Sequence, residues 1–152
     1  MINFSQDFLD RLDEIHTSIE QAIQGISQEA LDWSPGEGMN SITVLIIHLT
    51  GAERYWIGDV ALEDPSSRDR AAEFRAGSIP LDALQARLAD SSAYAQSAIT
   101  KLTLADLEQE RVSPRDGRKF TVAWALLHAL EHSALHLGHI QITRQLWEEQ
   151  KR

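Results

Sequence analysis

The most chemically suggestive feature of this chain is a group of histidines in its last long apolar-periodic stretch, residues 120–147. Four of the six histidines lie there: His128, His132, His136 and His139. Each residue turns an α-helix by about 100°, so these side chains fall within about 80° of one another on one helix face. A buried imidazole without a partner is costly, and each therefore needs a hydrogen bond or a shared metal ion. A His pair four residues apart can present two ring nitrogens to one ion, so the spacing favours a metal site.

The helix alone does not determine which pair would bind. His128/His132 and His132/His136 have the same spacing, about 6 Å along the helix axis. The two remaining histidines are His48, in the middle of another apolar stretch, and His16, beside the apolar stripe of the first. We expect His16 to lie at the surface or to fill the core without a functional role.

Composition limits the other chemistry that is available. The sequence has no cysteine, which excludes disulfides, thiolate metal sites, iron–sulfur clusters and a cysteine nucleophile. Any metal chemistry must therefore use His, Asp or Glu. The net charge of -9 and the pI near 5.0 argue against a nucleic-acid partner, because phosphate binding requires clustered Lys and Arg. Solubility is the simpler explanation of that charge.

Length and patterning predict one domain spanning residues 1–152, long enough to bury a core without disulfides. The first residues carry Asp7, Asp10 and Arg11 among apolar ones, unlike a signal peptide. No run approaches the roughly 18 apolar residues that a membrane span needs. We therefore expect a soluble cytoplasmic protein with no membrane partner.

Apolar residues that recur every three or four positions predict four amphipathic helices. Gly25 is expected to end the first helix, Ser41 to cap the second and Pro80 to occupy the first turn of the third. Since alternating strand patterns are almost absent, these elements predict an all-α fold, an up-down four-helix bundle with long connections. The predicted helices span residues 5–24, 42–58, 80–101 and 120–147.

The connection at residues 63–78 has no strong periodicity and is long enough to be of functional interest. It contains Arg68, Arg70 and Arg75. These arginines either hold a carboxylate of a ligand near the metal or, more simply, balance the acidic residues around them.

The other long connection, residues 103–119, contains the strong turn signal Ser113-Pro114-Arg115-Asp116-Gly117. With Val112 and Phe120 as anchors on either side, it predicts a short hairpin-like excursion. We expect both connections to line the mouth of the site and to set substrate choice.

Three segments of the chain resemble a known family. They are NSI at residues 40–42, HLTGAERYW at residues 48–56 and HSALHLGHI at residues 132–140. Together with the LDW turn at residues 31–33, they resemble the DinB/YfiT-like superfamily over essentially the whole chain.

The resemblance implies a four-helix bundle in which three histidines surround a divalent metal, commonly zinc or nickel. One histidine comes from the second helix and an H-x-x-x-H pair comes from the fourth, so the implied ligands are His48, His132 and His136. For His128 a structural or supporting role is then expected. His139 replaces the Gln of the Gly-Gln-Ile that often follows the last ligand, and it either adds a polar group near the site or faces solvent.

Three neutral imidazoles leave at least one coordination position open, as in catalytic zinc sites. A water there would have a lowered pKa and could act as a nucleophile, or a substrate thiolate could take its place. Glu53 and Glu131 lie near the ligands in sequence but not squarely on their helix faces, so we expect both to be solvated or ion-paired. Acceptors for the other ring nitrogens are also expected.

The resemblance also implies a chemistry. Similar proteins include transferases and isomerases that use a low-molecular-weight thiol such as mycothiol or bacillithiol, and others described as metal-dependent hydrolases. We predict a thiol-dependent S-transferase-type enzyme acting on a small-molecule substrate; the alternatives are a metal-dependent hydrolase and a non-catalytic metal or small-molecule binding protein of the stress-response type. An external thiol suits a cysteine-free chain, because the reactive sulfur arrives with the cosubstrate. Similar proteins are often homodimers, and Trp33, Trp124 and Trp147 are candidates for exposed aromatic residues.

Overall fold

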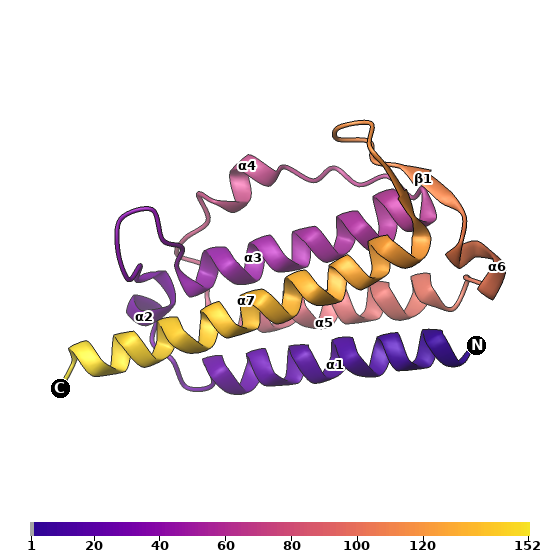
Figure 1. Cartoon of the computed structure of the whole chain (residues 1–152). Helices are drawn as coiled ribbons and strands as arrows, with labels where there is room; N and C mark the ends of the chain where they lie inside the picture. Colours follow the sequence, from indigo (N-terminus) through magenta and orange to yellow (C-terminus); the bar gives the residue numbers. More distant parts are fainter. Residues whose placement is uncertain (1) are drawn as a thin grey trace.

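The computed structural model describes residues 2–152, most of which are helical (Figure 1). The predicted all-α four-helix bundle is confirmed, but the expected up-down order is not, because the second and third long helices run in the same direction. Within the described range, no helix combines the length and apolar character needed to cross a membrane. The bundle consists of α1 (Asn3–Ile23), α3 (Ile42–Glu53) continued by the π-helix η1 (Arg54–Leu62), α5 (Leu81–Ile99) and α7 (Val122–Gln150). The shorter elements are α2 (Gln28–Asp32), α4 (Arg70–Glu73), α6 (Leu104–Leu107), β1 (Glu110–Val112) and β2 (Lys119–Thr121).

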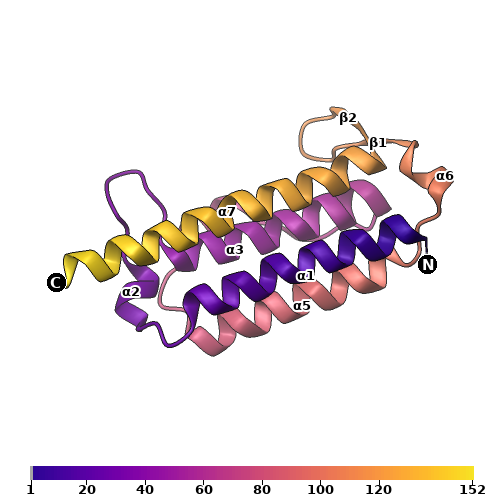
Figure 2. The same ribbon diagram turned by 60° about the horizontal axis from the view of Figure 1, so that its bottom comes forward.

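The helix directions depend on the long connection that precedes α5. α1 and α7 run one way, whereas α3 and α5 run the other way (Figure 1), and α1 lies beside α5 (Figure 2). Thr50 of α3 contacts Arg87 of α5, and Glu53, one turn later, contacts Ser91, one turn later in α5. The same order along both helices shows that α3 and α5 are parallel. Two parallel neighbours cannot be joined by a tight turn, so residues 63–80 return the chain along the bundle.

Side-chain caps explain where the helices that carry the site begin. The Ser41 hydroxyl accepts a hydrogen bond from the backbone N–H of Val44 at the start of α3. Thr121 does the same for the N–H of Trp124 at the start of α7. Each hydroxyl satisfies one of the donors that the first helical turn leaves free. α1 ends just before Gly25, whose positive φ of 66° favours glycine.

The core consists of two adjoining apolar clusters, one around Trp56 and Leu126 and the other around Leu49 and Ile140. Both draw residues from α1, α5 and α7, so each side chain that a helix presents inward joins neighbours from the other helices. Burying a leucine or isoleucine stabilises the fold by about 1.5–3 kcal/mol before entropy is considered. This packing holds α3 and α7 against each other and so fixes the distance between their side chains.

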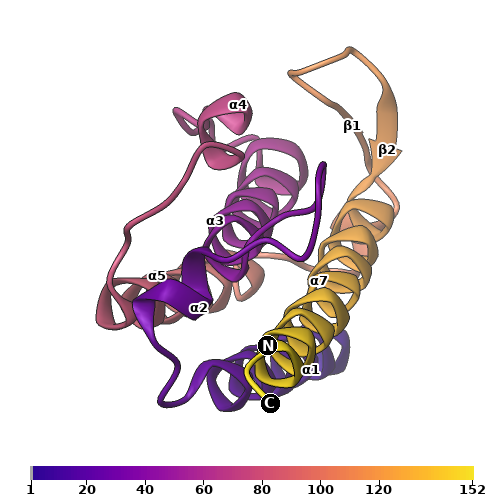
Figure 3. The ribbon, with the colours of Figure 1, turned by 90° about the vertical axis from the view of Figure 1, so that its left-hand side faces the viewer.

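The predicted hairpin-like excursion is confirmed, since β1 pairs antiparallel with β2. Only one of its expected anchors packs on the bundle. The ring of Phe120 lies 5.1 Å from that of Trp56, whereas Val112 is 57% exposed. Figure 3 shows the hairpin beside the start of α7 and α4 beside α3, so the two long connections lie outside the helices that carry the histidines.

The three tryptophans predicted as candidates for exposure differ in their surroundings. Trp124 is 43% exposed. Trp33 and Trp147 are partly buried and pack against each other, with ring centroids 5.6 Å apart. This pair joins the end of α7 to the loop after α2, and it leaves Trp124 as the exposed aromatic residue of the three.

Candidate metal centre

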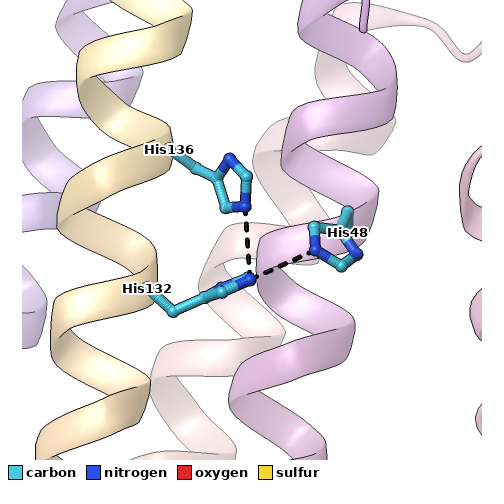
Figure 4. A group of neighbouring side chains, drawn as sticks. All are labelled: His48, His132 and His136. Carbon is cyan, nitrogen blue, oxygen red and sulfur yellow. Dashed lines mark hydrogen bonds between the residues drawn. The ribbon is translucent and has the colours of Figure 1, made fainter.

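Three histidines converge between α3 and α7 (Figure 4). His48 comes from α3, and His132 and His136 come from successive turns of α7. The Nε2 atom of His132 lies 3.1 Å from Nε2 of His48 and 3.2 Å from Nε2 of His136. One nitrogen from each of the three lies within 4.8 Å of the others. The structure thus brings together the three histidines that the family resemblance selected.

His48 is oriented by Glu73, a residue of α4 that no sequence pattern singled out. The Nδ1 atom of His48 lies 2.8 Å from Oε2 of Glu73, and both residues are buried. Their contact depends on Gly51, one turn further along α3. A Cβ at Gly51 would lie 2.1 Å from Oε1 of Glu73, far inside van der Waals contact. Glycine therefore lets the carboxylate lie directly against the helix.

Glu73 is ionised despite its burial. Burial acts to raise the pKa of Glu73, but hydrogen bonds from His48 and Arg68 outweigh it and hold the pKa below its ordinary value. Arg68 donates from Nε to Oε1 at 2.6 Å and from Nη2 to Oε2 at 2.9 Å. The expected pairing of Arg68 with a nearby acidic residue is confirmed. Because a carboxylate only accepts, His48 carries its proton on Nδ1 and directs the Nε2 lone pair at His132.

The outer nitrogen of His136 also has a partner. Its Nδ1 lies 3.2 Å from Nδ1 of His139. A proton on His136 Nδ1 can be donated to the His139 lone pair, which leaves Nε2 of His136 available to a metal. Since His139 is exposed, it both adds a polar group to the site and faces solvent.

His132 lies between the other two imidazoles. Its Nδ1 is a buried atom without a hydrogen-bond partner among the described residues. Burial, followed by repulsion from neighbouring histidines, lowers the pKa of His132 to about 3. Burial and the neighbouring histidines also lower the pKa of His136 to about 4. Both rings are therefore neutral at pH 7, which is the form that coordinates a metal.

This set of donors fits a divalent metal. Three imidazoles meet through Nε2, and acceptors for the outer Nδ1–H are in place at His48 and His136. In the described part of the chain, no carboxylate is hydrogen-bonded to the Nε2 atom of any of these three histidines. All-nitrogen sites of this kind accept zinc, nickel, cobalt or iron.

His128 takes part in aromatic packing instead. Its ring stacks on Trp124 at 4.8 Å with planes 12° apart, and it meets the edge of Trp56 at 4.8 Å. Its Nδ1 lies 3.5 Å from a carboxylate oxygen of Glu131, which is exposed. The structure therefore groups the His132/His136 pair with His48 and leaves out His128. Glu131 is the solvated carboxylate that was expected.

Glu53 is not solvated but is paired within the core, which is the second of the two states expected for it. It is 1% exposed and accepts a hydrogen bond from Ser133 at 2.6 Å. Nε2 of His16 lies 2.9 Å from the same carboxylate, and Nδ1 of His16 lies 2.6 Å from Ser92. The network joins α1, α3, α5 and α7 in the core, so His16 is a core residue. Periodicity could not reveal it, because its members come from four separate helices.

Phe74 packs against the ring of His48, and Arg70 packs against Phe74. The Phe74 ring lies 4.7 Å from the His48 ring and is 38% exposed. The guanidinium of Arg70 lies 5.0 Å from the Phe74 centroid, so this arginine packs on an aromatic ring. Arg75 is exposed on the following turn. Of the three arginines in this connection, only Arg68 reaches the residues that hold the cluster.

The fold and the site define a helical-bundle protein with a three-histidine cluster between two of its helices. The sequence profile of the DinB superfamily matches residues 11–140, which include all three histidines. The chain belongs to the DinB superfamily, as the sequence resemblance predicted.

Solved structures share this fold. A conserved protein from Enterococcus faecalis matches with a TM-score of 0.78 at 18% identity, over 96% of this chain and 98% of that chain. YfiT from Bacillus subtilis, described as a probable metal-dependent hydrolase with an unusual four-helix bundle topology, matches with a TM-score of 0.75 at 17% identity, over 95% of this chain and 89% of that chain. At these identities the likeness is one of fold. No curated protein matches the sequence.

Proposed function

We propose that this chain binds one divalent metal ion through Nε2 of His48, His132 and His136 and uses it in a reaction on a small-molecule substrate. The observation that carries the proposal is the convergence of the three nitrogens, at 3.1 and 3.2 Å from the central one. Lone pairs that meet in this way repel one another unless a proton or a cation lies between them. Zinc or nickel suits these ligands, which are neutral imidazoles.

The surrounding residues would keep the ligands in the coordinating form. Glu73 holds the outer proton of His48, and His139 can accept that of His136, so both rings keep Nε2 free and directed at the cluster. When bound, the ion supplies Lewis acidity, which lowers the pKa of a water or a thiol in the remaining position. A bound water or thiol with a lowered pKa would then lose its proton without a separate general base beside the Nε2 atoms of the three histidines.

Hydrolysis is the reaction that we propose first. It needs only the three ligands, water and a substrate with an electrophilic carbon or phosphorus. The description of YfiT as a probable metal-dependent hydrolase supports it, because the two chains share their fold.

Thiol transfer is the second candidate and would use the same three histidines. In that case a low-molecular-weight thiol such as bacillithiol or mycothiol would be the cosubstrate. The absence of cysteine from the chain is compatible with this reaction, because the reactive sulfur would arrive with the cosubstrate. The two reactions differ in whether turnover requires an added thiol.

The test compares metal-free protein with protein reloaded with zinc or nickel. Two probes distinguish the reactions: p-nitrophenyl acetate in water, and chlorodinitrobenzene with added bacillithiol. Metal-dependent turnover of the ester without thiol supports hydrolysis, whereas turnover only with thiol supports transfer. His132→Ala should abolish either activity, and His128→Ala should retain it. Equal rates for the reloaded parent and His132→Ala on both probes would refute an enzymatic role and leave a non-catalytic binding protein.

We also propose that the protein forms a homodimer through the outer face of α7. Trp124, Leu135 and Ile142 are 43, 56 and 46% exposed. They fall within about 20° of one another around the helix, so a second copy could cover them together. Light scattering should give twice the monomer mass for the parent and the monomer mass for Leu135→Glu. A cytoplasmic location and the lack of a nucleic-acid partner stay predictions from composition.

A further inference from the structure

A cavity lies beside α3 and borders the candidate metal centre through Glu73, the partner of His48. Its volume is about 400 Å³, and none of the three clustered histidines lines it. Its walls come from α3 and the start of η1, from residues 66–73 and from Arg87 of α5. A smaller cavity of about 220 Å³ adjoins it and shares Arg54 and Arg87. The volume of the larger cavity is typical of small-molecule sites.

Arginine is concentrated around this cavity, although the protein as a whole carries a net charge of -9. Arg54, Arg68 and Arg87 line it, against only two carboxylates, Asp69 and Glu73. The lining arginines therefore outnumber the lining carboxylates by one, before Asp59 and Asp64, which pair with Arg54, are counted. Such a local concentration of arginine in an acidic protein favours an anionic ligand.

Two of these arginines are already paired with carboxylates. Arg68 is held by Glu73. Arg54 donates to Asp59 at 3.0 Å and to Asp64 at 3.2 Å. Neither has its full charge available to a ligand, so Arg87 is the lining arginine that can bind an anion.

Arg87 is oriented but not neutralised. Its Nε donates to Oγ1 of Thr50 at 2.7 Å, and Thr50 in turn donates to the carbonyl of Ile46. Among residues 2–152, no carboxylate forms an ion pair with Arg87, and Nη1 and Nη2 have no hydrogen-bond partner. One bond at Nε limits the rotation of the guanidinium and leaves free the two N–H groups that form a fork with a carboxylate.

We propose that this cavity binds a small aliphatic monocarboxylate, with the carboxylate on Arg87 and the alkyl body over Ile47 and Ala72. One unpaired guanidinium matches a monoanion. A phosphate dianion would bring a second negative charge close to Asp69 and Glu73, and no further unpaired arginine lines the cavity to balance it. Ile47 and Ala72 give the remainder of the ligand an apolar surface on which to pack.

This site goes beyond the proposed metal chemistry and does not depend on it. Arg87 contacts neither Glu73 nor a clustered histidine, so the carboxylate fork forms with or without a metal. Arg68 does border both regions, because it lines the cavity and binds the carboxylate that holds His48. The binding test therefore uses metal-free protein, in which failure of the metal proposal has no effect.

The experiment is a titration of the metal-free, ¹⁵N-labelled full chain with sodium butyrate at constant ionic strength, followed by amide chemical shifts. Butyramide, which has the same shape without the charge, and inorganic phosphate serve as comparison probes. The variant is Arg87→Gln, which removes the charge of an exposed side chain and should not disturb the fold. The matched control is Arg75→Gln, an arginine outside the cavity.

Saturable shifts at Gly51 and Ala72 with butyrate are expected, with binding at least tenfold weaker in Arg87→Gln and unchanged in Arg75→Gln. Butyramide and phosphate should bind at least tenfold more weakly than butyrate. Equal weakening in both arginine variants, equal binding of butyramide, or tighter binding of phosphate would each overturn the proposal. So would shifts that do not saturate or that lie away from the cavity.

Discussion

Replacing Gly51 with alanine should weaken metal binding although residue 51 touches no metal ligand. The added Cβ would lie 2.1 Å from Oε1 and 2.9 Å from Cδ of Glu73. An ordinary contact needs about 3.4 Å or more, so the carboxylate must move by roughly 1 Å. Arg68 donates two hydrogen bonds to the same carboxylate, which limits the rotation of the Glu73 side chain away from residue 51.

That movement is large compared with the contact that it disturbs. The hydrogen bond from His48 Nδ1 to Glu73 is 2.8 Å long, and a shift of about 1 Å takes it beyond hydrogen-bond distance. Loss of such a partner typically lowers metal affinity about 10- to 100-fold. This corresponds to about 1.4–2.7 kcal/mol of binding free energy.

The assay is competition for zinc between the protein and a chelating dye, with Gly138→Ala as the matched control. Gly138 lies on α7 two residues after His136, and among the described residues nothing lies within 4 Å of its Cβ position. Both changes favour the helix by about 1 kcal/mol, so propensity does not separate them. Gly51→Ala should bind zinc at least tenfold more weakly, and Gly138→Ala should match the parent. A folded Gly51→Ala protein with affinity within twofold of the parent would refute the role given to Glu73.

Three further predictions concern stability and the outer residues. In the folded metal-free protein the pKa values of His132 and His136 lie near 3 and 4, below the ordinary 6.5, so the unfolded chain binds more protons below about pH 6.5. Melting temperature should therefore fall as pH drops from 6.5 to 5, and His132→Phe should show a shallower fall; an equal slope would contradict the burial argument. His139→Ala should weaken zinc binding by about tenfold or less in the dye assay, because the residue is exposed, whereas His139→Gln, which keeps an acceptor, should stay close to the parent. Glu53→Ala removes a buried acceptor shared by three helices and should reduce the free energy of unfolding by about 3 kcal/mol in urea titration, while metal stoichiometry at saturating zinc is unchanged.

Much of the bundle could be predicted from sequence because its signals are local. A helix places residues three and four apart on one face. Periodicity alone therefore locates most ends of the four long helices to within a few residues. Ser41 and Gly25 act on their own turn of chain and are readable for the same reason. The π-helical continuation of α3 was not predicted, because its apolar pattern resembles that of an ordinary helix.

The site was only partly predictable because its contacts are distant in sequence. The shared face of His132 and His136 follows from their spacing, but their meeting with His48 depends on how α3 and α7 pack. Glu73 reaches His48 across 25 residues, through a connection without periodicity. The burial of Glu53 likewise arises from partners on other helices. Such contacts depend on the folded geometry and leave no local pattern.

The most direct test of the central claim is the metal content of untagged protein purified without chelator and reloaded with zinc. The account predicts about one equivalent in the parent and little in His48→Ala or in the His132→Ala/His136→Ala double variant. His128→Ala, which removes the other histidine with the same spacing, should retain about one equivalent. Full occupancy in the first two variants, or none in the reloaded parent, would contradict the metal site; loss in His128→Ala would contradict the choice of ligands.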